Sequence, residues 1–204
     1  MNREGQSAIK NHFDRLYKQG ITPWKNHPPS SLLIRFFALL KASAAKARLL
    51  DLGCGDGWLT IEAARVSIAA WGIDASETAI ERAEKSAKST GIASKTKFAA
   101  GDALDLPYED NFFDGMIDRG LFHHILTENR QLYFDNILRV LKKDALVYLA
   151  VFSENNPEGI GQRFTGKDIA ALFGRYFRII QTEKDKLPTT APAHLLHLIL
   201  KKTQ

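Results

Sequence analysis

From residue 48 onward, short apolar runs alternate with longer segments in which apolar residues recur at helical spacing. The runs have the length and composition of strands that are buried on both faces of a sheet. Helical segments between such strands are typical of parallel strands joined by crossover helices. The predicted strands are Arg48–Gly53, Ile68–Asp74, Thr96–Gly101, Phe113–Ile117 and Ala145–Phe152. The predicted helices are Leu59–Arg65, Glu77–Ser89 with Ser76 as its N-cap, and Glu128–Leu141 with Thr127 as its N-cap.

The C-terminal part of the chain departs from this alternation. A short helix, Lys167–Phe173, ends near Gly174, and the runs Tyr176–Thr182 and Ala193–Lys201 follow it with no helix between them. Two consecutive strands without a crossover pair most simply as an antiparallel hairpin. The sequence therefore predicts an α/β fold. We expect a Rossmann-like, doubly wound and mostly parallel sheet that ends in an antiparallel hairpin and carries helices on both faces.

Two further helices are predicted ahead of the first strand. Residues 6–18 and 30–46 have helical patterns, and Pro23, Pro28 and Pro29 separate them. Proline restricts the residue before it to extended conformations, so a helix ends there. We expect residues 1–47 to form a helical lid segment over one edge of the sheet, and residues 48–204 to form the domain that carries the site.

The length and composition indicate one ordinary soluble domain. The chain has 204 residues, of which 45% are hydrophobic and 25% are charged. The apolar run from Leu32 to Leu40 contains Arg35 and is shorter than the ~20 residues that span a bilayer. It also lies too far from the N-terminus for a signal peptide. We therefore expect a cytoplasmic protein without membrane contact, which the single cysteine, Cys54, fits.

The positive charge is concentrated in the flanks of the chain. Residues 1–48 hold nine Lys or Arg and two acids, whereas residues 49–152 hold eleven and sixteen. A basic flank can attract nucleic acid or anionic ligands. Here the basic residues occur singly and form no stripe, which favours a solvated surface. The sequence predicts no nucleic-acid partner and leaves the oligomeric state open.

A glycine-rich turn carries the strongest chemical signal. The segment LLDLGCGDGWLT, residues 49–60, places an apolar strand directly before three glycines and a helix. Such a turn lets a ligand approach the main chain, and a dinucleotide phosphate is one candidate. The glycines are Gly53, Gly55 and Gly57. The third is one residue too early for the dinucleotide pattern, where Trp58 stands instead, and the chain has no Tyr-x-x-x-Lys pair of a short-chain dehydrogenase.

Acidic residues stand at the ends of three successive predicted strands. Asp51 precedes the glycine turn, and its carboxylate would repel a pyrophosphate but attract an ammonium or sulfonium group. Asp74, beside Ala75, can accept hydrogen bonds from both hydroxyls of a ribose. Asp102 and the amide of Ala103 can contact an adenine ring. Each acid alone would more often be a helix cap, but together they predict an adenosyl site.

The segments LLDLGCGDG, GIDAS and GDALDLPYEDNFFD resemble the successive motifs of class I S-adenosylmethionine-dependent methyltransferases, from about Leu49 to the C-terminal hairpin. The resemblance implies S-adenosylmethionine as cofactor and S-adenosylhomocysteine as product. It assigns cofactor contacts to Gly53, Asp74, Asp102 and Ala103. It also places Arg119 near the methionine end of the cofactor and Trp24 over the reactive methyl group, although Trp24 would serve equally well as a packing residue of the lid.

Within that superfamily, FFDGMIDRGLFHHI and RQLYFDNILRVLKKDALVYLAVFSEN resemble the thiopurine and tellurite-resistance-like group. Its members methylate sulfur, selenium, tellurium or halide acceptors, so the resemblance implies a small-molecule acceptor. Two features depart from the group. Lys142–Ala145 replaces the frequent Lys-Pro-Gly-Gly turn of the superfamily, and the thiopurine enzymes have a different glycine loop.

Methyl transfer is an in-line displacement that depends chiefly on alignment and the exclusion of water. A thiol acceptor needs little base catalysis, because it is partly ionised near neutral pH. If a general base exists, Asp118 or His123, after the fourth strand, is best placed. His123 and His124 are adjacent, so at most one can face the site from a helix. The histidines and the cysteine show no metal-ligand spacing, and we expect no metal.

Two alternatives to a small-molecule methyltransferase remain open: an enzyme that methylates a protein, and a module that binds the cofactor without catalysis. Amino-methyltransferases that act on nucleic acids place an Asn/Asp-Pro-Pro-aromatic tetrad after the fourth strand, where this chain has Asp118, Arg119, Gly120 and Leu121. That class is therefore disfavoured, but a protein lysine or carboxylate remains a candidate acceptor. The other alternative is a module that binds the cofactor without catalysis.

Overall fold

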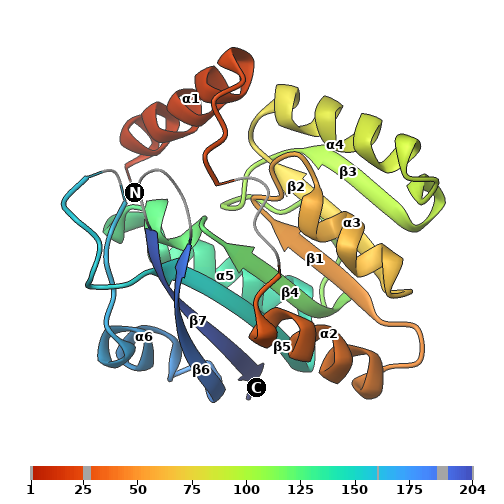
Figure 1. Ribbon diagram of the computed structural model, residues 1–204. Helices are drawn as coiled ribbons and strands as arrows, with labels where there is room; N and C mark the ends of the chain where they lie inside the picture. The colour runs from red at the N-terminus through yellow and green to blue at the C-terminus, as the bar shows by residue number, and fades with distance from the viewer. Residues whose placement is uncertain (1, 25–28, 160, 188–192, 204) are drawn as a thin grey trace.

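The computed structural model describes residues 2–24, 29–159, 161–187 and 193–203 (Figure 1). Its strands form one sheet in the order β3-β2-β1-β4-β5-β7-β6. The strands are β1 (Arg48–Leu52), β2 (Ala69–Asp74), β3 (Thr96–Ala100), β4 (Phe113–Arg119), β5 (Leu141–Phe152), β6 (Phe177–Leu187) and β7 (Ala193–Lys202). The strands β1 to β5 pair in parallel, and β7 pairs antiparallel with both β5 and β6. The predicted mostly parallel sheet with a terminal antiparallel hairpin is confirmed.

Helices cover both faces of this sheet, as predicted (Figure 1). On one face, apolar side chains of α2 (Ser31–Ser43) and α3 (Trp58–Arg65) pack against the strands, and α4 (Glu77–Ser89) continues this layer over β2 and β3. On the other face, α5 (Arg130–Val140) and α6 (Gly166–Phe173) enclose a second apolar cluster. Parallel strands need cover on both sides because they are apolar on both sides. Because helices cover both faces, only an edge of the sheet is left open to a ligand.

The two N-terminal helices play different parts. The first, α1 (Arg3–Gln19), lies across the edge of the sheet at which the parallel strands end (Figure 1). The second, α2, was expected to lie with it over an edge, but its apolar side packs on the sheet face, where Phe36 and Leu40 are fully buried. The prediction is wrong for α2 because its apolar residues match a core helix and not a lid. The boundary after residue 47 stays a prediction.

Several element ends differ from the predictions. The helix expected from Glu128 begins at Arg130, after the 3₁₀ turns η2 (Phe122–His124) and η3 (Thr127–Asn129), and Thr127 is not its N-cap. The Asn129 side chain does not cap the helix either, because it bonds to the backbone of Asn2 instead. Strand β4 continues through the charged Asp118 and Arg119, and β6 continues to Leu187 as a polar edge strand.

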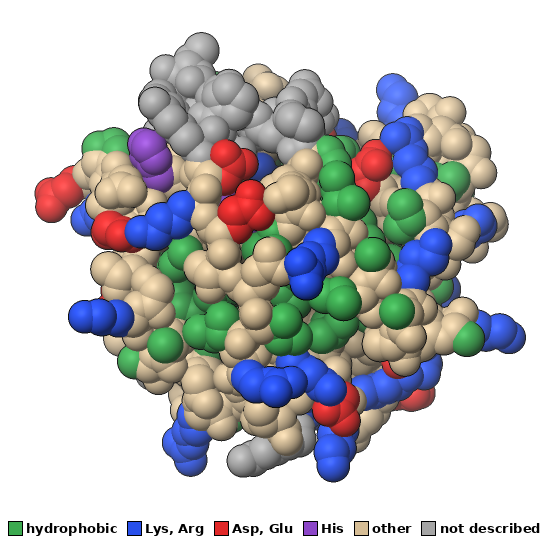
Figure 2. Space-filling view, turned by 60° about the horizontal axis from the view of Figure 1, so that its bottom comes forward, with side chains coloured by type: hydrophobic (Ala, Val, Ile, Leu, Met, Phe, Trp, Pro, Cys, Tyr) green, Lys and Arg blue, Asp and Glu red, His purple; other side chains and the backbone are tan. Residues whose placement is uncertain are grey.

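One face of the molecule fits the scattered charge pattern of the sequence. Figure 2 shows one face on which Lys and Arg side chains lie mostly apart from one another around a central group of hydrophobic side chains. Within the described ranges, no helix is both long enough and apolar enough to cross a bilayer.

Candidate active site

A cavity of about 360 Å³ opens along the edge of the sheet where the parallel strands end. Its volume lies in the usual range for small-molecule sites, roughly 300 to 1,000 Å³. Its walls come from the loops that follow β1, β2 and β3, from the ends of β4 and β5, from the start of β7 and from α1. In open parallel sheets, ligands bind at this edge.

The glycine turn after β1 brings the main chain to this cavity. Gly55 has φ of 56°, and a Cβ added there would lie 2.3 Å from the Tyr17 hydroxyl oxygen of α1. Gly57, with φ of 78°, begins α3, and a Cβ there would overlap Phe98 and Ala83. Gly53 and Gly55 line the cavity, whereas Gly57 is not part of its lining. Gly57 therefore shapes the turn, and the other two admit close approach of a ligand.

The three strand-end acids all line the cavity. Asp74 accepts hydrogen bonds from the backbone amides of Gly55 and Ser76, each at 2.9 Å. Asp102 accepts from the amide of Leu104 at 2.9 Å and forms an ion pair with Lys10 of α1. The neighbouring Ala75 and Ala103 line the cavity as well. The structure thus brings together the residues that the sequence grouped.

Asp51 lies deepest of the three. It is 2% exposed, and its carboxylate accepts a hydrogen bond from the Thr60 hydroxyl at 2.7 Å. Burial raises the pKa of Asp51 to about 7 and also raises the pKa of Asp74. Neither carboxylate forms an ion pair with a described Lys or Arg residue. A cationic ligand in the cavity would compensate this buried negative charge.

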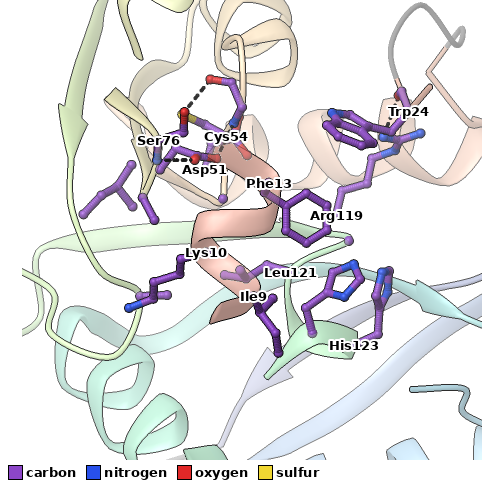
Figure 3. A pocket seen from close by; sticks show the side chains of 18 of the residues that line it. Ile9, Lys10, Phe13, Trp24, Asp51, Cys54, Ser76, Arg119, Leu121 and His123 are labelled. Atoms are coloured by element: carbon purple, nitrogen blue, oxygen red, sulfur yellow. Dashed lines mark hydrogen bonds between the residues drawn. The ribbon is translucent and has the colours of Figure 1, made fainter. Parts of the chain in front are cut away.

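Trp24 and Arg119 form the opposite wall (Figure 3). The Trp24 indole N–H donates to the Tyr17 hydroxyl at 3.2 Å, and the Arg119 guanidinium donates to the Trp24 carbonyl at 3.5 Å. Arg119 also lies 5.6 Å from the centre of the Trp58 ring, and burial lowers its pKa. Trp24 therefore packs on α1 and borders the cavity, so the two roles considered for it are compatible.

Asp118 and His123 do not fit the predicted role of a general base. Side chains alternate along β4, so Arg119 faces the cavity and Asp118 faces α5. Asp118 is fully buried, and its carboxylate accepts from the amides of Leu121 and Phe122 and from the Tyr133 hydroxyl. It does not line the cavity. This geometry corrects the expectation for Asp118, which has no free oxygen to take a proton from a ligand.

His123 does line the cavity, from η2. Its Nδ1 accepts a hydrogen bond from the backbone amide of Phe152 at 3.2 Å, and its ring stacks on the Phe152 ring at 3.8 Å. Burial lowers the pKa of His123 well below its usual value. With Nδ1 occupied and the ring held neutral, a role as general base receives no support. His124 lines the cavity too. The expectation that only one of the two adjacent histidines could face the site assumed a helix, whereas both lie in the 3₁₀ turn η2.

Several residues of the cavity were missed in the sequence. Lys10, Phe13 and Tyr17 all come from α1, and Phe152 and Leu195 come from the ends of β5 and β7. Only Phe152 lies in a segment that carries the resemblance, and nothing in that segment marks it as a site residue. The spacing of the α1 residues marks one face of a helix but not what that face covers. Among the described residues, no three or more of His, Cys, Asp and Glu gather as metal ligands would.

Structural comparison shows that the chain shares its Rossmann-like fold with solved methyltransferase structures. The structure of the Burkholderia thailandensis 1,6-didemethyltoxoflavin-N1-methyltransferase, with its ligand and S-adenosylhomocysteine bound, superposes with a TM-score of 0.82 at 22% identity and covers 100% of this chain and 91% of that chain. A SAM-dependent methyltransferase from Methanosarcina mazei has a TM-score of 0.75 at 22% identity, over 87% and 99% of the two chains.

A family model described as a methyltransferase domain matches residues 43–189, and the chain belongs to this family. Norajmaline N-methyltransferase of Rauvolfia serpentina is 29% identical over 109 residues, which are 53% of this chain and 37% of the relative. Ajmaline N-methyltransferase of the same plant is 30% identical over 102 residues, or 50% and 34%. The matched segment thus spans little more than a third of these relatives. The predicted methyltransferase class and its cofactor are confirmed at the level of the family, whereas the thiopurine and tellurite-resistance-like subgroup stays a prediction.

Proposed function

We propose that this chain transfers the methyl group of S-adenosylmethionine to a small-molecule acceptor and releases S-adenosylhomocysteine. One observation carries the proposal. The glycine turn and three strand-end acids border a single cavity that continues, beneath Trp24 and Arg119, into a space lined by aromatic rings. A buried, negatively charged end beside an apolar end suits a cationic cofactor next to an organic acceptor.

The cavity residues suit the parts of the cofactor in order along the sheet. Asp102 and Ala103 would hold the adenine, and Asp74 with Ala75 would hold the ribose. Gly53 and Gly55 would allow the main chain close to the cofactor. Asp51 would pair with its ammonium group and Arg119 with its carboxylate, because the two side chains carry the opposite charges. Trp24 would cover the methyl group.

Methyl transfer requires little from the protein beyond the alignment of the acceptor with the methyl group. A new bond forms between the acceptor atom and the methyl carbon while the bond from that carbon to sulfur breaks, and the sulfur becomes neutral. The bound cofactor supplies this activated methyl group. The walls of the cavity orient the acceptor in line and exclude water, and α1 with Tyr17 and Phe13 closes the cavity from above. Neither Asp118 nor His123, the two expected bases, is free to take a proton, so the acceptor would supply its own lone pair or ionise in water.

The nature of the relatives supports a small-molecule acceptor. The two curated relatives are named as N-methyltransferases of norajmaline and ajmaline, and the Burkholderia structure contains 1,6-didemethyltoxoflavin. Sulfur, selenium and tellurium nucleophiles remain candidates on the sequence resemblance. The cover by α1 favours a small acceptor over the side chain of a folded protein.

An acceptor screen tests the proposal. Purified protein and S-adenosylmethionine are incubated with thiols, selenite, tellurite, thiopurines and heteroaromatic amines, and the formation of S-adenosylhomocysteine is measured by mass spectrometry. We expect turnover above the acceptor-free control with at least one small molecule. Methylation of a protein substrate alone would contradict the proposed acceptor class, and binding without any turnover would favour a non-catalytic module.

A further inference from the structure

The half of the cavity away from the strand-end acids is lined by rings. We call it the ring-lined half; its members are Phe13, Trp24, His123, His124, Phe152 and Leu195. The rings are in continuous contact. Phe13 meets Trp24 at 5.6 Å and His124 at 4.7 Å between ring centres, and His123 meets His124 at 4.3 Å and Phe152 at 3.8 Å. Such walls favour a flat aromatic ligand.

The hydrogen position on His123 follows from its neighbours. A backbone amide can only donate, so the Phe152 N–H requires a lone pair on His123 Nδ1. In the neutral ring, Nε2 then carries the hydrogen. The near-parallel stack on Phe152, at 14° between planes, holds the ring in place, and a Cβ on Gly161 would lie only 3.1 Å from it. His123 is therefore a rigid hydrogen-bond donor.

No carboxylate shares this half of the cavity among the described residues. The lining acids all lie at the ends of β1 and β2 or in the loops that follow β1 and β3; they are Asp51, Asp56, Asp74 and Asp102. Asp118, the acid nearest to His123 in sequence, faces away from the cavity, and its carboxylate accepts three hydrogen bonds. The formal charge beside the rings is the Arg119 guanidinium. A cationic amine would thus meet the His123 N–H donor and no carboxylate side chain to offset its desolvation.

We propose that His123 is a specificity-determining hydrogen-bond donor, and that the acceptor is a flat, uncharged ring system with a carbonyl oxygen or an unprotonated ring nitrogen that binds the His123 N–H. This inference rests on the proposed function and goes beyond it, since it names the acceptor class and gives His123 a role other than proton transfer. It also separates this chain from enzymes whose acceptors are protonated amines.

Three bicyclic probes of similar size test the inference in protein saturated with S-adenosylhomocysteine. Isocarbostyril is flat and carries a carbonyl, naphthalene is flat without polar atoms, and tetrahydroisoquinoline is a protonated amine. By calorimetry we expect isocarbostyril to bind at least about tenfold more tightly than the other two, the effect of one well-formed hydrogen bond or one uncompensated charge. Equal or tighter binding of tetrahydroisoquinoline, or no binding of any probe, would overturn the inference.

Variants of His123 isolate the donor. His123→Phe keeps a ring on Phe152 but loses the N–H, so isocarbostyril should bind only about as tightly as naphthalene. His123→Gln restores an N–H donor and should recover part of the preference. His194→Phe is the matched control, because residue 194 alternates with the lining residues of β7 and should not affect the probes. An unchanged preference in His123→Phe would refute the donor role.

The affinity for S-adenosylhomocysteine separates the possible failures. All variants should bind it as the unmodified protein does, which shows that they are folded. If the unmodified protein fails to bind it, the proposed function itself is wrong. If it binds while the probe preference is absent, only the inference about the acceptor fails.

Discussion

At the scale of single residues, the charge state of Asp51 matters most for ligand binding. Its carboxylate is buried with one hydrogen bond from Thr60, and its pKa is raised from 3.8 to about 7. Near neutral pH the group is thus close to half ionised without ligand. An ammonium group in the cavity would favour the ionised form. Cofactor binding should therefore stabilise the ionised carboxylate of Asp51, which burial disfavours in the protein without ligand.

This gives a pH prediction for cofactor affinity. Below about pH 7, Asp51 must lose a proton before it can pair with the ammonium, so the affinity for S-adenosylmethionine should fall as the pH decreases. Asp51→Asn should bind more weakly at pH 8 and show a flatter pH profile. Calorimetric titration from about pH 6 to pH 8 measures both. A profile in the unmodified protein as flat as that in Asp51→Asn would contradict the assignment.

The same pKa predicts an effect on stability. The folded-state pKa of about 7 lies above the unfolded value of 3.8, so the contribution of Asp51 favours folding below the unfolded pKa and is lost as the pH rises through about 7. Without ligand, Asp51→Asn should therefore gain stability relative to the unmodified protein as the pH rises from 4 to 8. Thermal melts of the two proteins at several pH values show whether the difference grows in that direction or stays constant.

Asp74 tests the ribose contact. Asp74→Ala removes two charge-assisted hydrogen bonds, each worth roughly 1.5 to 3 kcal/mol, so the affinity for S-adenosylhomocysteine should fall at least tenfold. Asp74→Asn keeps an acceptor for the Gly55 amide and isolates the charge. Isothermal titration measures the affinities. Undiminished binding in Asp74→Ala would mean that Asp74 serves only to order the backbone of Gly55 and Ser76.

Trp24 tests the position of the methyl group. An aromatic face attracts a cation by about 0.5 to 2 kcal/mol, and S-adenosylmethionine carries a sulfonium that S-adenosylhomocysteine lacks. Trp24→Leu should therefore weaken S-adenosylmethionine more than S-adenosylhomocysteine. Equal losses with a lower melting temperature would show that Trp24 only packs on Tyr17 and Phe13. Arg119→Ala should instead weaken both ligands alike, because both carry the methionine carboxylate.

The sequence located the cofactor acids but not the geometry of the acceptor side. Asp51, Asp74 and Asp102 each lie at or just after the end of an apolar strand, and strand ends meet at one edge of a parallel sheet, so their proximity could be predicted. The same reasoning misplaced Asp118. Position at a strand end fixes the edge but not the face, and β4 continues through this residue, so its side chain alternates away from that of Arg119.

At the scale of elements, α1 is the piece that completes the site. It reaches the ends of three strands: Lys10 pairs with Asp102, Asp14 accepts a hydrogen bond from the Ser76 hydroxyl, and the Tyr17 hydroxyl lies over Gly55. The helix itself could be predicted, but its partners are between 38 and 92 residues away in sequence. Its docking follows from tertiary packing, which periodicity does not encode. The core role of α2 was missed although its apolar residues match a core helix.

The contact between α1 and the glycine turn can be tested by a double-mutant cycle. Gly55→Ala should lower stability, because its Cβ would lie 2.3 Å from the Tyr17 hydroxyl and because its φ of 56° strains an alanine by roughly 1 to 2 kcal/mol. Tyr17→Phe removes the hydroxyl, so the double variant should lose less than the sum of the single losses. Strictly additive losses in chemical denaturation would show that the contact contributes nothing.

At the scale of the whole molecule, the apolar core and the ligand-binding edge of the sheet occupy separate regions of the fold. Two apolar clusters hold helices on the faces of the sheet, and the buried residues of β5 and β7 link both. The edge of the sheet is thereby left to the loops, where polar groups can face a ligand without weakening the core. The alternation of strands and helices could be predicted because it reflects these two apolar faces. The ring-lined half as a whole could not, since its members come from α1, the segment after it that holds Trp24, η2, β5 and β7.

The central claim is that this edge binds an adenosyl cofactor through the glycine turn and the strand-end acids. Titration of the purified protein with S-adenosylmethionine, S-adenosylhomocysteine and NAD in a calorimeter tests it most directly. We expect saturable binding of both adenosyl ligands and none of NAD, because the third glycine comes early and Asp51 would repel a pyrophosphate. Binding of NAD without a response to either adenosyl ligand would contradict it.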